Sequence, residues 1–135
     1  MTYLLDTNMC IAYLRQRASP VRARLAAQSP TAIALCSVVK AELYHGAHKS
    51  AQPEQGLARL ATFFSAFASL PFDDRAAEVL GTLRAQLERQ GASLGPYDLM
   101  IAAIAVVHDL TLVTHNTREF SRIEGLRIED WESSP

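Results

Sequence analysis

The stretch Thr2–Asn8, TYLLDTN, decides the fold. Its apolar run, Tyr3–Leu5, is too short for a buried helix and has the aromatic and branched character of a strand. Asp6 follows this run directly, and Thr7 and Asn8 are residue types that cap helices. The pattern therefore predicts a buried strand that ends at Asp6 and passes into a helix. Because open α/β sheets bind their ligands beyond the carboxyl ends of the strands, Asp6 is the first candidate functional residue.

The composition limits the classes of protein to which the chain can belong. The chain has 135 residues, of which 49% are hydrophobic and 20% are charged. This amount of apolar material suits one core, and we expect a single domain over residues 1–135. The formal net charge of −1 provides no overall basic field for nucleic acid. A polyanionic partner must therefore be bound by a local patch or through a metal ion.

The cysteines and the chain start carry no sign of export. Cys10 and Cys36 lie in apolar stretches and match no metal-ligand spacing, so we expect two free, buried thiols. The sequence shows no secretory signal, and no apolar run reaches the length of a membrane-spanning helix. We therefore expect a cytoplasmic protein without a membrane segment.

Short apolar runs alternate with amphipathic segments along the rest of the chain. Helices are predicted after Asp6, at 20–28, after Ser37, from Pro53 toward Leu70, at 73–91, from Pro96 and at 117–120. Further strands are predicted at 32–36, 70–72, 112–114 and 126–129, with the second and the last at sheet edges. This order predicts an α/β fold with a short, mostly parallel sheet between layers of helices. Phe63 lies beside the apolar stripe of its helix, and we expect it to be buried against a second chain.

Two further acids are predicted at the same edge of the sheet as Asp6. Glu42 lies in the second turn of its helix, one position off the apolar stripe, and by itself fits a solvated face. Asp98 opens a helix in which residues 99–107 are all apolar, and by itself fits a helix cap. Three carboxylates close together raise one another's pKa unless a cation lies among them. Oxygen ligands of this kind favour Mg²⁺ or Mn²⁺, which can activate water for phosphodiester hydrolysis.

Four segments of the chain, taken together, resemble the VapC-type toxins of the PIN-domain ribonucleases. They are YLLDTN at 3–8, VVKAELYHG at 38–46, GPYDLMIAAIA at 95–105 and LVTHNTREF at 112–120. The resemblance covers essentially the full length and implies a three-layer α/β/α PIN-like domain. It also implies a Mg²⁺- or Mn²⁺-dependent endoribonuclease that acts on structured RNA, often tRNA. By the same resemblance, a cognate VapB-type antitoxin holds the toxin inactive with a C-terminal segment that crosses the acidic cleft, and we expect a homodimer within a larger complex.

The resemblance also implies roles for individual residues. Asp6 and Asp98 would hold the metal together with Glu42, which would also position or deprotonate the attacking water. Thr114 would hydrogen-bond within the site. Asn116 stands where many PIN domains carry a fourth acid, so the number of metal ions stays open.

Other residues near these segments have less specific signals. Glu119 lies one helical turn after Asn116 and reads as a solvated glutamate, although it can contribute through a water molecule. RNA must be bound by basic or polar side chains, of which Arg118, Lys40 and Asn8 are our candidates. Bases can stack on exposed aromatic side chains, for which we expect Tyr44 or Tyr97.

Two other function classes remain open on the sequence alone. The first is a PIN-like module that binds RNA or a partner without cutting, because Asn116 replaces an acid. The second is a phosphoacceptor signalling domain, although its usual lysine is replaced by His115 and Asn116 after the late strand. Within the nuclease class, single-stranded DNA is an alternative substrate.

Overall fold

The central sheet is built from five short strands that all run in the same direction. The computed structural model describes residues 1–15 and 19–132. Within these residues the strand order is β3-β2-β1-β4-β5, and every pairing is parallel. The strands are β1 (Tyr3–Leu5), β2 (Ile33–Cys36), β3 (Ala68–Leu70), β4 (Thr111–Val113) and β5 (Ile128–Glu129). The predicted α/β class with a parallel sheet is therefore confirmed.

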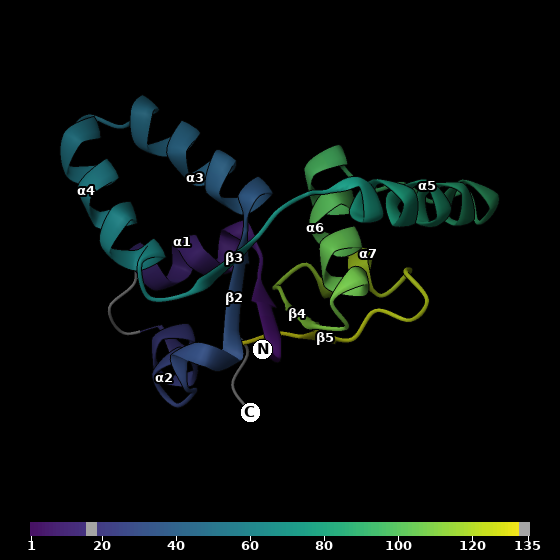
Figure 1. Cartoon of the computed structure of the whole chain (residues 1–135), viewed down its shortest axis with the longest axis horizontal. Coiled ribbons are helices and arrows are strands. Elements are labelled where there is room, and N and C mark those ends of the chain that lie inside the picture. The colour runs from purple at the N-terminus through teal and green to yellow at the C-terminus, as the bar shows by residue number, and fades with distance from the viewer. Residues whose placement is uncertain (16–18, 133–135) are drawn as a thin grey trace.

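Helices cover the sheet on both sides. They are α1 (Thr7–Arg15), α2 (Pro20–Ala26), α3 (Ser37–Lys49), α4 (Pro53–Phe64), α5 (Asp74–Arg89), α6 (Pro96–Val107) and α7 (Thr117–Phe120). A 3₁₀ turn at Pro30–Ala32 leads into β2. Figure 1 shows α1 to α4 on the left of the strands and α5 to α7 on the right, so the architecture has three layers. In the described ranges, no helix is long and apolar enough to cross a membrane.

Strand β1 lies at the centre of the sheet because its side chains tolerate burial on both faces. Leu4 and Leu5 are completely buried. β1 pairs with β2 on one side and with β4 on the other, and the backbone N–H of Asp6 continues the ladder to the carbonyl of Val113 at 3.1 Å. The strand order reverses at β1, which makes its carboxyl end the switch point of the topology.

Helix α6 is the buried helix that the sequence predicts. Residues 101–105 are all fully shielded from solvent. α6 packs along α5 on one side and touches α3 on the other. The start of α6 is therefore brought next to α3 at the carboxyl edge of the sheet.

The segment after α4 differs from the prediction. The helix ends at Phe64, and β3 occupies Ala68–Leu70, two residues earlier than predicted. Pro71 follows the strand because proline lacks the N–H that a ladder position uses. The predicted place of this strand at a sheet edge is confirmed.

The expectation that Phe63 serves a second chain is wrong. Its side chain is only 7% exposed within its own chain. It stacks on Tyr13 with ring centroids 5.2 Å apart and meets Phe67 edge-on at 5.4 Å. The extra aromatic ring is thus used to pack α4 against α1.

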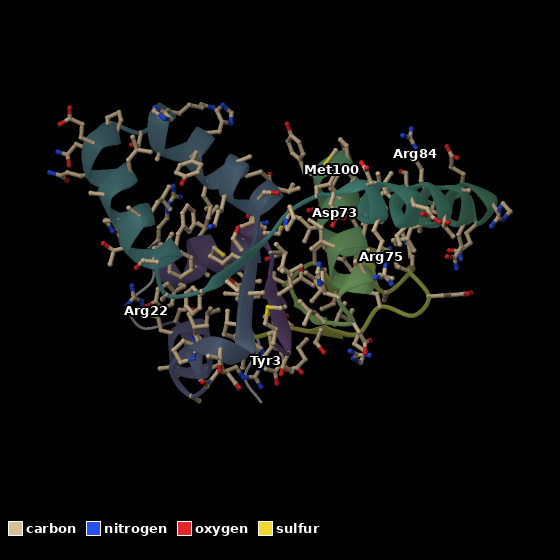
Figure 2. All side chains as sticks on the ribbon, viewed as in Figure 1. Tyr3, Arg22, Asp73, Arg75, Arg84 and Met100 are labelled. Atoms are coloured by element: carbon tan, nitrogen blue, oxygen red, sulfur yellow. The ribbon has the colours of Figure 1, made fainter. Side chains whose placement is uncertain are left out.

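Several local signals behave as predicted. Asp73, labelled in Figure 2, caps α5 by accepting the N–H of Ala76 at 3.0 Å. Gly91 ends that helix with a φ of +71°, a conformation that favours glycine. Cys10 and Cys36 are free and buried.

The last strand is shorter than predicted, because only Ile128 and Glu129 pair with β4.

Candidate active site

Asp6 lies at the carboxyl end of β1 and is almost fully buried, with 4% of its surface exposed. Its Oδ1 accepts the backbone N–H of Met9 at 2.9 Å. Asp6 itself therefore caps α1, whereas the sequence suggested Thr7 and Asn8 for that purpose. The cap fixes one oxygen of the carboxylate relative to the helix.

Thr114 holds Asp6 from the neighbouring strand. It follows β4 directly and is completely buried. Its Oγ1 accepts the backbone N–H of Asn116 at 2.9 Å, and its hydroxyl is hydrogen-bonded to the Asp6 carboxylate. Since this hydrogen bond lowers the pKa of Asp6, it favours the ionised carboxylate, which can only accept, and the hydroxyl hydrogen of Thr114 is therefore directed to Asp6. Thr114 thus lies beside Asp6, and its role in the reaction stays a prediction.

The charge of Asp6 is disfavoured in the metal-free protein. Burial raises the pKa of its carboxyl to about 6, and the negative charges of Asp98 and Glu132 act in the same direction. The hydrogen bonds from Thr114 and Met9 oppose this rise in pKa. A buried carboxylate beside other acids is stabilised by a cation.

Glu42 reaches the same place from α3. Its Oε1 accepts the hydroxyl of Thr7 at 2.6 Å. Thr7 is the residue after Asp6, so the bond ties Glu42 to the start of α1. Sequence reasoning did not assign Thr7 a role in the site; its only signal was a small hydroxyl residue directly after the candidate acid.

Asp98 completes the predicted set from the first turn of α6. It is partly buried, and burial raises its pKa. The nearby charges of Glu42 and Glu119 raise the pKa further. Since Asp98 in turn acts on Asp6, the three predicted acids share one electrostatic environment.

Glu119 joins this group, which corrects the expectation of a solvated side chain. It is partly buried, and its Oε2 accepts a hydrogen bond from Nδ2 of Asn116 at 3.0 Å. Asn116 has no carboxylate of its own, but its side-chain amide binds the carboxylate of Glu119. Asp6, Glu42, Asp98 and Glu119, hereafter the acid cluster, contribute four carboxylates.

The acid cluster has the donor chemistry of a site for a hard divalent cation, although no three of its carboxylates bring ligand oxygens within 4.8 Å of one another in residues 1–15 and 19–132. All its donors are carboxylate oxygens, the ligand type that Mg²⁺ and Mn²⁺ prefer. Within residues 1–15 and 19–132, none of the four acids forms an ion pair with a lysine, arginine or histidine side chain. Gathered negative charge without a protein cation is the expected environment of a metal site.

The remaining candidates lie at the surface. Asn8 and Arg118 are exposed, and Nζ of Lys40 sits 4.8 Å above the ring of Phe64. Tyr44 is 43% exposed and Tyr97 is 56% exposed. Their contact with RNA stays a prediction.

Comparison with known proteins identifies the family to which the chain belongs. The model of the PIN domain family matches residues 3–126. The tRNA(fMet)-specific endonuclease VapC of Shigella flexneri is 43% identical over 131 residues, which cover 97% of this chain and 98% of the relative. Ribonuclease VapC2 of Rickettsia felis is 37% identical over 134 residues, covering 98% and 99%.

Solved structures show the same fold. The crystal structure of DNA-bound VapBC from Salmonella typhimurium has a TM-score of 0.91 at 41% identity, with 97% of this chain and 98% of that chain covered. The family match spans nearly all of the sequence, and the relatives align over almost their whole length. The chain therefore belongs to the PIN domain family, among its VapC-type members.

Proposed function

We propose that this protein is the toxin of a type II toxin–antitoxin system, an endoribonuclease that cuts structured RNA, with tRNA as the foremost substrate. The observation that carries the proposal is the electrostatic coupling of acids from separate elements: Asp98 acts on Asp6, and Glu42 and Glu119 act on Asp98. The names of the relatives, tRNA(fMet)-specific endonuclease and ribonuclease, support it. Its place of action is the cytoplasm, where tRNA is found.

Each acid has a defined part in the proposed reaction. Asp6 and Asp98 would hold Mg²⁺ or Mn²⁺ together with Glu42, and Glu119 adds a fourth negative charge. A divalent ion bound there would lower the pKa of a water molecule and offset charge on the phosphate. Glu42 orients the attacking water and accepts its proton, while Thr7 fixes the position of the Glu42 carboxylate.

Thr114 and Asn116 keep the acids in place. Thr114 directs its hydroxyl hydrogen to Asp6, which leaves the other lone pairs of that carboxylate for the metal. Asn116 donates to Glu119 and so restrains this carboxylate, whose charge acts on Asp98. Both residues position the acids.

RNA would approach the acid cluster along the surface between α3 and α6. Tyr97 precedes Asp98 by one residue and Tyr44 follows Glu42 by two, so an exposed aromatic ring accompanies each acid. Such rings can stack on unpaired bases. Lys40, Arg118 and Asn8 would contact the RNA backbone.

The antitoxin would occupy an apolar groove beside the acid cluster. A cavity of about 360 Å³ lies between α1, α3 and α4, and its lining includes Ile11, Leu14 and Leu43. Glu42 belongs to the same lining, so a peptide in this groove reaches the acid cluster. Structures of similar proteins are VapBC complexes, some bound to DNA, which supports a VapB-type partner. A toxin homodimer within a larger complex is part of the proposal.

A PIN-like module that binds without cutting is the second candidate. It was favoured by Asn116 in place of an acid. The structure weakens this reason, since Asn116 holds Glu119 beside Asp98. The nuclease is therefore the better proposal.

The decisive experiment maps the ends of cellular RNAs after brief induction of the wild type and of Asp98→Asn. We expect new 5′ ends in structured RNA, tRNA first, only with the wild type. Asp74→Asn is the matched control, because Asp74 is an exposed acid in the first turn of α5. Identical ends with Asp98→Asn, or no new ends with the wild type free of antitoxin, would contradict the proposal.

A further inference from the structure

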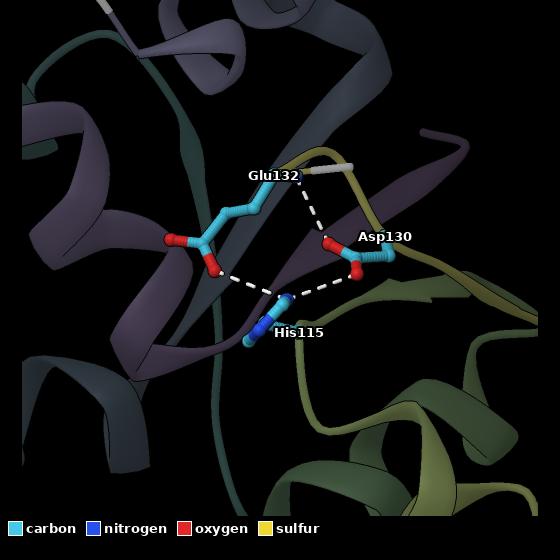
Figure 3. Close-up of side chains that lie close together, drawn as sticks. All are labelled: His115, Asp130 and Glu132. Carbon is cyan, nitrogen blue, oxygen red and sulfur yellow. Dashed lines mark hydrogen bonds and ion pairs between the residues drawn. The ribbon is translucent and has the colours of Figure 1, made fainter. Parts of the chain in front are cut away.

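A second group of potential ligands lies outside the acid cluster. Nδ1 of His115 is 2.9 Å from Oδ2 of Asp130 and 3.2 Å from Oε2 of Glu132. Figure 3 shows the two carboxylates converging on one ring nitrogen. One ligand atom from each of the three residues lies within 4.8 Å of the others. None of them is a member of the acid cluster.

The strand register brings these residues together. β4 and β5 are parallel neighbours in which Val113 pairs with Glu129, and the N–H of Thr114 bonds to the carbonyl of Glu129 at 2.9 Å. His115 follows the first strand and Asp130 the second, so their side chains leave the same edge of the sheet.

The segment that carries the two acids is firmly anchored. Trp131, between them, is only 2% exposed and packs edge-on against Tyr3 at 5.1 Å. Nη1 of Arg24 donates to the carbonyl of Asp130 at 2.9 Å, which ties the segment to α2. The N–H of Glu132 donates to Oδ1 of Asp130 at 2.9 Å. The three ligands are therefore preorganised, which lowers the entropic cost of binding an ion.

A single proton fits this arrangement less well than a metal ion. One ring N–H must be shared between the two carboxylates, which weakens each hydrogen bond, whereas an ion among the three atoms contacts all of them directly. The hydrogen bond to Asp130 and the charges of Asp130, Glu132 and Asp6 raise the pKa of His115, so these groups favour positive charge at the ring nitrogen, from a proton or from a metal ion. The separations of 2.9 and 3.2 Å between Nδ1 and the two carboxylate oxygens suit an ion bound at roughly 2.0–2.2 Å from each atom.

We propose that His115, Asp130 and Glu132 form a second metal site, which binds a divalent transition metal ion of the Zn²⁺ or Mn²⁺ class. The imidazole nitrogen makes the site different in kind from the acid cluster, whose donors are all oxygens. Nitrogen ligation favours these ions over Mg²⁺. The site has room for water molecules or a further ligand, because the His115 side chain is 64% exposed.

The nitrogen donor gives the proposal a direct spectroscopic test. Tag-free protein is loaded with Mn²⁺, and pulsed electron paramagnetic resonance detects coupling of the ion to imidazole ¹⁴N. We expect this coupling in the wild type and in Asp98→Asn, and its loss in His115→Gln. Because Asp98 belongs to the acid cluster, a nitrogen signal that survives Asp98→Asn reports the second site even if the proposed nuclease function fails.

Calorimetric titration with Zn²⁺ supplies the affinity. Loss of the imidazole is expected to weaken binding at this site by at least about tenfold. The double variant His45→Gln/His48→Gln is the matched control, since it removes two exposed histidines of α3 and should leave both the coupling and the affinity unchanged. Circular dichroism verifies that His115→Gln remains folded.

Two results would overturn the proposal. One is the absence of ¹⁴N coupling in the wild type at saturating Mn²⁺. The other is coupling and Zn²⁺ affinity that are the same in His115→Gln as in the wild type. The three side chains would then be an ion pair between a protonated imidazole and two carboxylates.

Discussion

Thr7 donates its hydroxyl hydrogen to Glu42 over 2.6 Å and so joins the first turn of α1 to the second turn of α3. The two residues are 35 positions apart in the chain. A hydrogen bond to a charged acceptor at this distance is strong and directional. It restrains the Glu42 carboxylate against Thr7, the residue that follows Asp6.

Replacing Thr7 by valine should therefore lower RNA cleavage without unfolding the protein. Valine keeps the shape of threonine and removes the donor, at a cost of about 1.5–3 kcal/mol for a hydrogen bond to a charged group. We expect the cleavage rate to fall roughly 10- to 100-fold. Thr7→Ser retains the hydroxyl and should restore most of the rate. Equal activity of the valine and serine variants would show that the bond does not position Glu42.

The raised pKa of Asp6 predicts how stability varies with pH in metal-free protein. The folded carboxyl titrates at about 6 and the unfolded one at about 3.8, so the folded state binds more protons between these values. The contribution of Asp6 to the free energy of unfolding should consequently fall as pH rises from about 4 to above 6. The total decrease should be roughly 3 kcal/mol. Asp6→Asn removes this titration and should be more stable than the wild type above about pH 7.

Urea unfolding in the presence of a chelator checks this prediction over the same pH range. Saturating Mg²⁺ or Mn²⁺ should reverse the order, because the ion stabilises the ionised wild-type carboxylate and not the amide. A wild type whose stability follows the same pH profile as Asp6→Asn would contradict the assigned titration.

The sequence predicts the main acids because each one follows a local signal. Asp6 comes directly after an apolar run, and Asp98 opens a helix that is apolar throughout, so both positions can be placed without a structure. Glu42 is identified by its offset from an apolar stripe. Their meeting at one edge follows from the parallel order of the strands.

The residues that sequence reasoning missed depend on contacts between distant segments. The role of Thr7 can be recognised only when the distance between α1 and α3 is known. That of Glu119 can be recognised only when the direction of the Asn116 side-chain amide is known. The group of His115, Asp130 and Glu132 depends on the register of β4 and β5, which neither segment encodes alone. The end of α4 was misplaced because the helical spacing of apolar residues continues past Phe64 into β3.

Glu119→Gln tests whether the fourth carboxylate contributes to metal binding. Glutamine can still accept the hydrogen bond from Asn116 through its carbonyl oxygen, so the local structure is kept while one negative charge is lost. We expect the Mg²⁺ concentration for half-maximal cleavage to rise several-fold. A tenfold rise would correspond to a loss of about 1.4 kcal/mol in Mg²⁺ binding free energy. The rate at saturating Mg²⁺ should stay near that of the wild type.

Glu124→Gln is the matched control for this measurement, because Glu124 is an exposed glutamate in the loop after α7. If the wild type, Glu119→Gln and Glu124→Gln all show the same Mg²⁺ dependence, Glu119 does not contribute to metal binding.

Tyr97 provides the last test, which concerns RNA binding alone. Its ring is 56% exposed and precedes Asp98 by one residue, so a base stacked on it would bring the adjacent phosphate toward the acid cluster. Stacking on an aromatic side chain is worth about 1–3 kcal/mol per base, hence Tyr97→Ala should weaken RNA binding by roughly 5- to 150-fold, whereas Tyr97→Phe should bind like the parent. Both substitutions are made in an Asp98→Asn background so that the RNA stays intact, and affinity is read by fluorescence anisotropy with a labelled tRNA. If the alanine and phenylalanine variants bind equally well, the RNA does not stack on α6, and the approach to the site lies along α3 beside Tyr44.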